Sequence, residues 1–394
     1  MQGFMDRLAD VLGKFANRIN NLRYIMVIKN AFAALIPVII TGAFGTLFSA
    51  MVFDAENGLA QIEALRFLES LKPISSAVSY VTLSFLTIYA VFLIGIELAK
   101  LNKISGVFPG IIAVMSYLSV NPMIFEFLHE DATVVAENVL AKQYTDTKGL
   151  FLGMFVAIVS IELYAWLGRQ KRLQITMPDS VPGNVSASFS ALFPTIFTVT
   201  IIATAGFAIK ALTGMYAYDI IYNVVQRPLE GIVQGLPGIL LLMFIAQVFW
   251  VIGIHGNQMV KPIREPLLLA AIAVNTEAFE AGKEVPNIIT MPFWDMYMSM
   301  GGSGVTIGLL IAILIVGKRE DMRQITKLSL APGIFNINEP VIFGMPIMLN
   351  PILAIPFILT PLVTGTIGYV ATSLGFAAKA VVMVPWPMPP IVNA

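Results

Sequence analysis

Long apolar runs alternate with short polar linkers along the first half of the chain. These runs cover residues 25–52, 75–99, 104–121, 149–167 and 188–212. About 20 apolar residues are enough for an α-helix to cross the hydrocarbon core of a bilayer. The pattern therefore predicts five membrane-spanning helices before residue 214.

The second half has a different pattern, because proline, glycine and polar residues cut its apolar stretches into short pieces. Ordinary spans are predicted at 236–254, 303–317 and 351–373, and broken segments at 259–274, 288–302, 328–349 and 376–394. Broken segments are tolerated inside a membrane only where protein or a water-filled cavity covers their backbone. In transporters, such segments form the binding site near the midplane. We therefore expect the second half to carry the chemistry.

An amphipathic stretch at 216–232 separates the two halves and is typical of a helix lying at the membrane surface. The predicted organisation is a membrane scaffold domain over 1–214, an amphipathic connector helix over 215–235, and a substrate-binding and transport domain over 236–394. The predicted fold class is an all-α polytopic membrane protein. It would contain about eight to ten transmembrane helices with re-entrant hairpins and interfacial helices.

Composition agrees with a membrane protein and excludes several kinds of chemistry. The chain is 57% hydrophobic and 12% charged, with a mean hydropathy of +0.81, whereas soluble domains contain about 25% charged residues. Its net charge of zero gives no sign of a nucleic-acid partner. The absence of cysteine excludes disulfides, thiolate metal sites and cysteine nucleophiles. With only His129 and His255, a histidine-rich metal site is also excluded, and we expect no cofactor.

The distribution of charge in the linkers predicts the orientation in the membrane. The N-terminal segment, the turn at 100–103 and the loop at 169–172 are basic, whereas the linkers at 53–73 and 122–148 are acidic. Basic loops stay in the cytoplasm, so the N-terminus should be cytoplasmic and both acidic linkers should face outward. Residues 1–24 lack a signal-peptide pattern and read as an interfacial amphipathic helix, or alternatively as a plain cytosolic helix.

One carboxylate interrupts the apolar pattern near the end of the chain. In Asn338-Glu339-Pro340, an N-cap-type residue precedes a proline that fits the first turn of a helix. The residue before proline is pushed toward extended geometry, so Glu339 should lie at a helix start and point into a cavity. Acids inside a membrane are costly and usually functional. The alternative is a helix cap paired with a lysine or arginine.

A histidine ends the sixth predicted span. His255 is followed by Gly256 and Asn257, so a ligand can approach the backbone closely and an amide can meet sugar hydroxyls. Together with Glu339, His255 could orient or tune a general base. The alternative is an ordinary interfacial histidine. His129, in an acidic linker, is expected to be inert.

Trp386 lies in a proline-rich extended stretch, where its ring could stack on the apolar face of a sugar or serve as an interfacial belt residue. Trp166 and Trp294 are interpreted as belt residues. The Gly301-Gly302-Ser303-Gly304 sequence lacks the lysine of a phosphate loop and is interpreted as a hairpin tip.

Several segments now resemble one known family, enzyme IIC of the bacterial phosphotransferase system, of the lactose/cellobiose/diacetylchitobiose type. The resemblance covers almost the whole chain. The motifs that carry it are Pro332-Gly333-Ile334-Phe335-Asn336-Ile337-Asn338-Glu339-Pro340-Val341-Ile342-Phe343-Gly344 with Leu349-Asn350-Pro351, Ile254-His255-Gly256, Gly301-Gly302-Ser303-Gly304, Met177-Pro178-Asp179-Ser180-Val181-Pro182 and Val384-Pro385-Trp386.

The resemblance implies a homodimer in the bacterial plasma membrane, with its interface in the N-terminal domain. It implies uptake of a β-linked disaccharide such as cellobiose, diacetylchitobiose or lactose, and phosphorylation of the sugar's 6-hydroxyl by a phosphocysteine of IIB. Glu339 would accept or orient the hydroxyl proton and His255 would assist. Sugar contacts are expected from Asn338, Asn257, Gly256, Trp250 and Trp386.

The absence of cysteine then implies that IIB, which docks on the cytoplasmic face, and IIA are separate polypeptides. Members of the family continue with another apolar segment beyond the position of Ile391, so we expect the transport domain to be incomplete at Ala394. Two other classes of function stay open. One is a proton-coupled sugar symporter that uses Glu339, and the other is a membrane enzyme acting on lipid, for which no metal or nucleotide motif is found.

Overall fold

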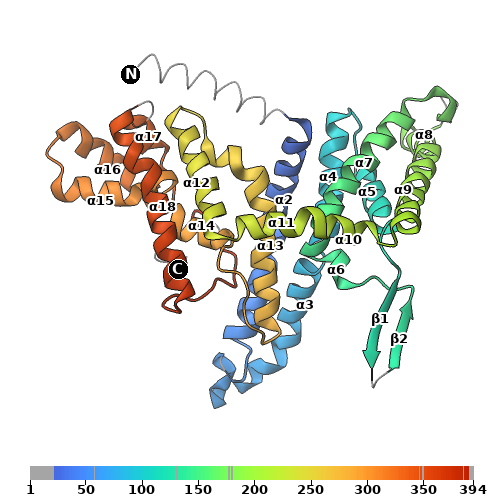
Figure 1. Ribbon diagram of the computed structural model, residues 1–394, viewed down its shortest axis with the longest axis horizontal. Coiled ribbons are helices and arrows are strands. Elements are labelled where there is room, and N and C mark those ends of the chain that lie inside the picture. The colour runs from blue at the N-terminus through green and yellow to red at the C-terminus, as the bar shows by residue number, and fades with distance from the viewer. Residues whose placement is uncertain are drawn as a thin grey trace. The chain divides into compact units, whose positions relative to one another are not determined.

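The computed structural model describes residues 22–56, 58–129, 132–175, 178, 181–345, 347, 350–384 and 386–389 (Figure 1). Most of these residues are helical. The predicted amphipathic helix over 1–24 lies outside the described residues except at its end. The α-helices are α2 (Arg23–Met51), α3 (Lys72–Leu83), α4 (Leu86–Leu101), α5 (Phe108–Ser119), α6 (Lys142–Thr145), α7 (Leu150–Gly168), α8 (Gly183–Ser190), α9 (Leu192–Thr213), α10 (Ala217–Ile221), α11 (Arg227–Val233), α12 (Leu236–Val251), α13 (Gly256–Glu280), α14 (Met291–Met298), α15 (Thr306–Val316), α16 (Glu320–Ile334), α17 (Glu339–Gly344) and α18 (Pro351–Ser373).

Several helices are long and apolar enough to cross a membrane. Within the described residues, five stretches meet this criterion: Arg23–Thr46, Thr147–Gly168, Ser188–Thr213, Met291–Val316, which contains α14 and α15, and Ile352–Ser373. Two bent pairs, Glu63–Leu83 with Leu86–Leu101 and Ala217–Val233 with Leu236–Val251, raise the number to seven. The shorter apolar helix α5 lies in the third span predicted from the sequence, 104–121. The predicted polytopic helical fold is confirmed.

The linker at 122–148, predicted as an acidic loop, contains the antiparallel hairpin of β1 (Ile124–His129) and β2 (Ala132–Glu137). Its register runs from Ile124 opposite Glu137 to His129 opposite Ala132. Phenylalanine and valine are frequent in these two segments, and such residues favour strands. The acidic residues between them concealed this pattern. His129, which the sequence analysis predicts to be inert, is the last residue of β1.

The chain folds into two compact units. One unit combines Ile40–Ser79 with Leu229–Ala394, and the other combines Arg23–Ile39 with Tyr80–Pro228. Helices α2, α3 and α11 therefore contribute to both. The predicted division at 214 and 236 is a functional one and stays a prediction.

In the second unit, α4, α5 and α7 pack against one another around a core of small and branched side chains. Gly95 of α4 lies so close to α5 that a Cβ atom there would be 2.8 Å from the Cβ of Ala113. Small residues at such contacts let membrane helices approach closely, which replaces the hydrophobic driving force that lipid does not provide. This unit supplies a tightly packed scaffold.

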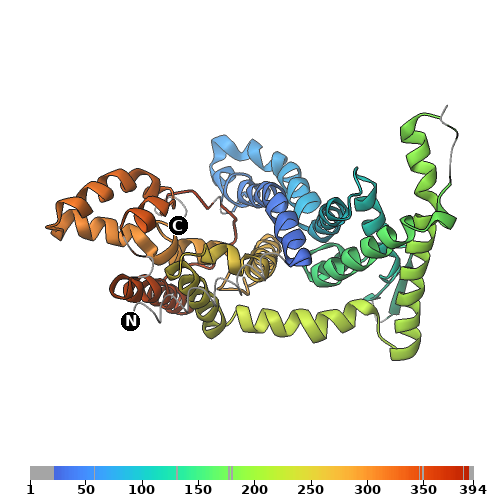
Figure 2. The same cartoon turned by 90° about the horizontal axis from the view of Figure 1, so that it is seen from above.

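The first unit contains the broken segments. α15 and α16 form a short antiparallel pair (Figures 1 and 2), and α14 is separated from α15 by a buried glycine-rich loop. The segment 259–274, predicted to be broken, is instead part of the continuous helix α13, with Pro262 and Pro266 inside it. Helix-interior prolines are tolerated in membrane proteins because neighbouring groups satisfy the freed carbonyls. The breaks therefore lie at the ends of α13, not within it.

Candidate functional site

Glu339 is the first residue of the short helix α17. Asn338 occupies the N-cap position and Pro340 lies in the first turn, as the sequence predicts. The backbone N–H groups of Val341 and Ile342 both donate to the Asn338 carbonyl, at 3.0 and 2.9 Å. Proline needs no hydrogen-bond partner at this position, so it fixes the helix start at no cost in backbone bonding. The Glu339 side chain is half exposed, with 46% of its surface accessible.

His255 immediately precedes α13 and faces Glu339. A turn with Gly253 at φ +89° separates it from the end of α12. Its ring packs on that of Trp250, with 4.3 Å between the ring centroids. His255 Nε2 lies 4.0 Å from Glu339 Oε1. The fold thus brings together two side chains that are 84 positions apart in sequence.

The gap between these two side chains suits a hydroxyl group. A distance of 4.0 Å is too long for a direct hydrogen bond. An oxygen about 2.8 Å from each atom would make two hydrogen bonds that meet at roughly a right angle. Burial lowers the pKa of His255 below its ordinary value, and the carboxylate of Glu339 opposes this shift only in part. Loss of charge lets an imidazole donate one N–H and accept at its other nitrogen, while a carboxylate can only accept.

A network of asparagine amides holds both side chains in place. Asn338 Nδ2 donates to the Ser303 carbonyl at 2.5 Å, and Asn257 Nδ2 donates to Ser303 Oγ at 3.0 Å. Ser303 belongs to the buried loop at 301–304, so this loop joins the starts of α13 and α17. We call Ser303 with Asn257, Asn336 and Asn338 the amide network. Sequence analysis missed the role of Ser303, although adjacent glycines beside a serine are a signal for a loop that accepts close contacts.

Asn336 connects the same loop to the end of the chain. Its Oδ1 accepts from the Gly301 N–H at 2.8 Å, and its Nδ2 donates to the carbonyls of Trp386 and Met388 at 2.6 and 3.0 Å. Asn336 itself has φ +64°, a conformation that asparagine tolerates better than most residues. The Trp386 backbone is thereby joined to the site, while its side chain is half exposed. Its predicted stacking on a sugar stays a prediction.

Close helix packing requires a glycine at position 256. A Cβ atom at this position would lie 1.7 Å from the Ala246 carbonyl oxygen of α12. The close crossing of α12 and α13 therefore excludes any side chain here. Its predicted contact with a ligand is not needed to explain the residue.

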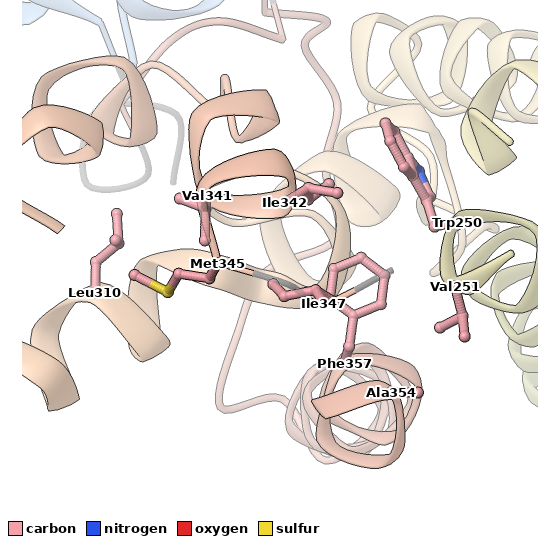
Figure 3. Close-up of a cluster of buried hydrophobic side chains, with 9 residues drawn as sticks. All are labelled: Trp250, Val251, Leu310, Val341, Ile342, Met345, Ile347, Ala354 and Phe357. Carbon is pink, nitrogen blue, oxygen red and sulfur yellow. The ribbon is translucent and has the colours of Figure 1, made fainter. Parts of the chain in front are cut away.

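An apolar cluster supports α17 from below (Figure 3). Val341 and Ile342 point from α17 toward Phe357 of α18, Leu310 of α15 and Trp250 of α12, and Met345, Ile347, Val251 and Ala354 complete the cluster. All nine side chains are buried. Trp250 takes part in this cluster and also packs on His255. Its Nε1 is buried and has no hydrogen-bond partner among the described residues.

A buried group of charged side chains lies along α13 and α14, which sequence analysis also missed. Lys261 Nζ is 3.2 Å from Glu265 Oε1, and Arg264 lies over the ring of Trp294 at 4.7 Å. Arg264 and Glu265 are almost fully buried. The interpretation of Trp294 as a belt residue is wrong, since only 1% of its surface is exposed. Trp166, by contrast, is 58% exposed.

Comparison with known proteins identifies the family of the chain. Residues 29–361 match the family "Phosphotransferase system, EIIC". The chain is 35% identical over 390 residues to the oligo-beta-mannoside-specific EIIC component of Bacillus subtilis, covering 98% of this chain and 86% of that protein. It is 30% identical over 395 residues to the cellobiose-specific EIIC component of Geobacillus stearothermophilus, covering 98% and 85%. The crystal structure of the transporter ChbC, the IIC component from the N,N'-diacetylchitobiose-specific phosphotransferase system, superposes with a TM-score of 0.90 at 29% identity, covering 98% and 89%.

Apolar helices, buried broken segments and this likeness in fold define the chain as the membrane component of a sugar transport system. The agreement extends over nearly the whole length of the chain, not over a single motif. The chain belongs to the EIIC family of the phosphotransferase system. The resemblance drawn from the sequence is confirmed, and nothing in the comparisons supports the alternative of a proton-coupled symporter.

Proposed function

We propose that this protein is a IIC subunit that binds a β-linked disaccharide, carries it across the plasma membrane and presents its 6-hydroxyl for phosphorylation by phospho-IIB. The names of its relatives support this substrate class, since they specify oligo-β-mannosides, cellobiose and N,N'-diacetylchitobiose. The sugar would contact Asn338, Asn257, Gly256, Trp250 and Trp386, as expected from the sequence. Its cytoplasmic N-terminus and its association into a homodimer belong to the same proposal.

The geometry of His255 and Glu339 carries the proposal. A sugar hydroxyl between them donates its proton to Glu339 and accepts a hydrogen bond from His255 Nε2–H. In the reaction, the hydroxyl oxygen forms a bond to phosphorus while the bond between phosphorus and the cysteine sulfur of IIB breaks. The hydroxyl proton passes to Glu339, and the sulfur leaves as a thiolate. Glu339 therefore prepares the nucleophile and supplies no phosphoryl group itself.

The phosphoryl donor must lie outside the 394 residues of this sequence, which contain no cysteine. We propose that the donor is the phosphocysteine of IIB, which docks on the cytoplasmic face. IIB would receive its phosphoryl group from IIA. The chain by itself would bind and translocate sugar without modifying it. A membrane subunit of the phosphotransferase system is thus half of an active site that the partner completes.

Purified protein in liposomes tests this division of labour. A thermal-shift screen against cellobiose, N,N'-diacetylchitobiose and lactose should first show stabilisation by at least one of them. Sugar phosphate should then form only after phosphorylated IIB is added. Product without IIB would overturn the proposal.

Glu339→Gln tests the role of the carboxylate. The amide keeps the size of the side chain but is a poor proton acceptor, so phosphorylation should fall by about 10²–10⁴-fold while sugar binding changes much less. Glu284→Gln is the matched control, because Glu284 is 93% exposed and pairs only loosely with Lys379 at 3.5 Å. Full phosphorylation by Glu339→Gln would remove Glu339 from the mechanism.

A further inference from the structure

A polar cavity lies within the first unit at the end of α13 opposite His255. Its volume is about 600 Å³, within the range of about 300–1,000 Å³ that is usual for small-molecule sites. Three segments form its wall: the end of α2 with the residues after it, the start of α3, and the end of α13 with the turn that follows. The lining residues are Thr46, Ser49, Asp54, Lys72, Ser76, Phe279, Glu280, Gly282 and Lys283.

Hydrogen bonds and close packing fix the wall of this polar cavity. Thr46 Oγ1 donates to Glu280 Oε1 at 2.7 Å and lies 3.0 Å from Ser79 Oγ, which ties α2 to both α13 and α3. Gly45 brings α2 against α3, since a Cβ there would lie 2.9 Å from the Ser75 carbonyl oxygen. These contacts hold the three wall segments together, and the exposed side chains of Ser76, Glu280 and Lys283 complete the lining.

The lining chemistry fits a neutral molecule with many hydroxyl groups. Two carboxylates, Asp54 and Glu280, balance two ammonium groups, Lys72 and Lys283, so the cavity offers no net charge to an ion. Asp54 and Lys72 already neutralise each other at 2.7 Å. Serine and threonine hydroxyls both donate and accept, carboxylates accept and ammonium groups donate, which together match the two-sided bonding of sugar hydroxyls. The ring of Phe279, 43% exposed, adds an apolar surface.

The length of α13 separates this cavity from His255. Its 25 residues, at about 1.5 Å each, span about 37 Å, compared with about 30 Å for the hydrocarbon core of a bilayer. Thr46 also ends the candidate span Arg23–Thr46, at the far end from the N-terminus. With a cytoplasmic N-terminus, the polar cavity opens on the outer side.

We propose that the polar cavity is a second saccharide site, which holds the neutral disaccharide on the outer face before it moves to His255 and Glu339. This inference rests on the proposed function and orientation. It assigns to the protein two sugar molecules per chain, one at each end of α13. The outer site only binds sugar, so filling it leaves the chemistry at the inner site intact.

Ser76→Phe tests this assignment. Ser76 is exposed and lines the cavity, so a phenyl ring fills the space without entering a packed core. Equilibrium dialysis of radiolabelled cellobiose against the protein in nanodiscs should give two molecules per chain for the wild type and one for Ser76→Phe. Ser70→Phe, an exposed serine outside the cavity, is the control and should keep two. Should Ser76→Phe fold poorly by thermal unfolding, Lys283→Met removes a donor of the same cavity and should also lose one molecule.

A second measurement separates this inference from the proposed function. In detergent, where phospho-IIB and sugar reach the inner site directly, Ser76→Phe should phosphorylate cellobiose with unchanged KM and kcat. In sealed right-side-out vesicles its KM for uptake should rise several-fold. One molecule per chain in the wild type, unaffected by Ser76→Phe, would overturn the outer site and leave the proposed function standing. No binding of cellobiose, N,N'-diacetylchitobiose or lactose to any form would overturn both.

Discussion

Gly302→Ala perturbs the amide network without touching Glu339 or His255. Gly302 has φ +93° and ψ −169°, a conformation that is essentially restricted to glycine. A Cβ atom there would lie 2.5 Å from Asn338 Cγ and 2.7 Å from Asn338 Oδ1. Asn338 cannot turn away freely, because its Nδ2 donates to the Ser303 carbonyl. An alanine must therefore either strain the loop or displace the residue that caps α17.

Both consequences can be given a magnitude. The backbone conformation costs an alanine about 1–3 kcal/mol, and losing the bond between Asn338 and Ser303 leaves buried polar groups unpaired at about 1–3 kcal/mol more. The expected total is a loss of about 2–6 kcal/mol in folding free energy. If the loop relaxes by displacing the start of α17 by about 1 Å, phosphorylation should fall on the order of 10²-fold.

Gly308→Ala is the matched control for this prediction. Gly308 lies in α15, and a Cβ atom there would have no neighbour within 4 Å. Alanine in a helix interior is favoured over glycine by about 0.5–1 kcal/mol, so this variant should unfold at the same or a higher temperature. Thermal unfolding in detergent and the rate of phosphorylation with excess phospho-IIB are the two assays. If Gly302→Ala equals the wild type in both, the amide network does not position Glu339.

A double-mutant cycle separates the cost of the backbone strain from the cost of the collision with Asn338. In an Asn338→Gly background there is no side chain to collide with, so Gly302→Ala should cost only the backbone strain of about 1–3 kcal/mol. The coupling between the two positions then measures the collision and the lost hydrogen bond. Strict additivity would show that the collision is absent and that strain in the loop explains the whole effect.

Two further predictions concern neighbouring residues. Burial lowers the pKa of His255 in the folded state, so the unfolded chain binds a proton first as the pH falls below about 6.5. Wild-type stability should therefore decline below this pH, and His255→Gln should lack that part of the decline when thermal unfolding is measured between pH 5 and 8. Identical profiles for the two proteins would contradict this prediction. Asn336→Ala removes the acceptor of the buried Gly301 N–H and the donor to the Trp386 carbonyl. We expect the free energy of unfolding to fall by about 1–3 kcal/mol and proteolysis near Trp386 to become faster. Unchanged cleavage would show that Asn336 does not hold the segment around Trp386 in place.

The sequence predicts most of the fold because hydrophobic length is a strong signal in membrane proteins. It also predicts the start of α17, since proline and an N-cap residue act locally. It does not predict the continuity of α13, because Pro262 and Pro266 normally end a helix and only the surrounding structure accommodates them. The hairpin of β1 and β2 is missed because its acidic residues dominate the composition of the linker.

The candidate site is predicted only in part, and for a physical reason. Glu339 and His255 stand out individually because each is a polar residue in an apolar setting. Their approach to 4.0 Å depends on Ser303, an ordinary residue whose importance comes from accepting two amides. Similarly, Arg264 and Glu265 are buried only because α13 is continuous and packs against Trp294. Such roles arise from tertiary contacts, which no local pattern encodes.

The distance between His255 and Glu339 matters for the function proposed here. If the two side chains were in contact, a sugar hydroxyl would have to break a charge-assisted bond before it could bind, and charge-assisted bonds are among the stronger ones in proteins. Instead, the amide network anchors the starts of α13 and α17 to one loop, which holds His255 Nε2 and Glu339 Oε1 4.0 Å apart, where one hydroxyl oxygen can bridge them. In the proposed mechanism, selectivity for a hydroxyl group would therefore reside as much in Ser303 and its amide partners as in the two side chains that would meet the sugar.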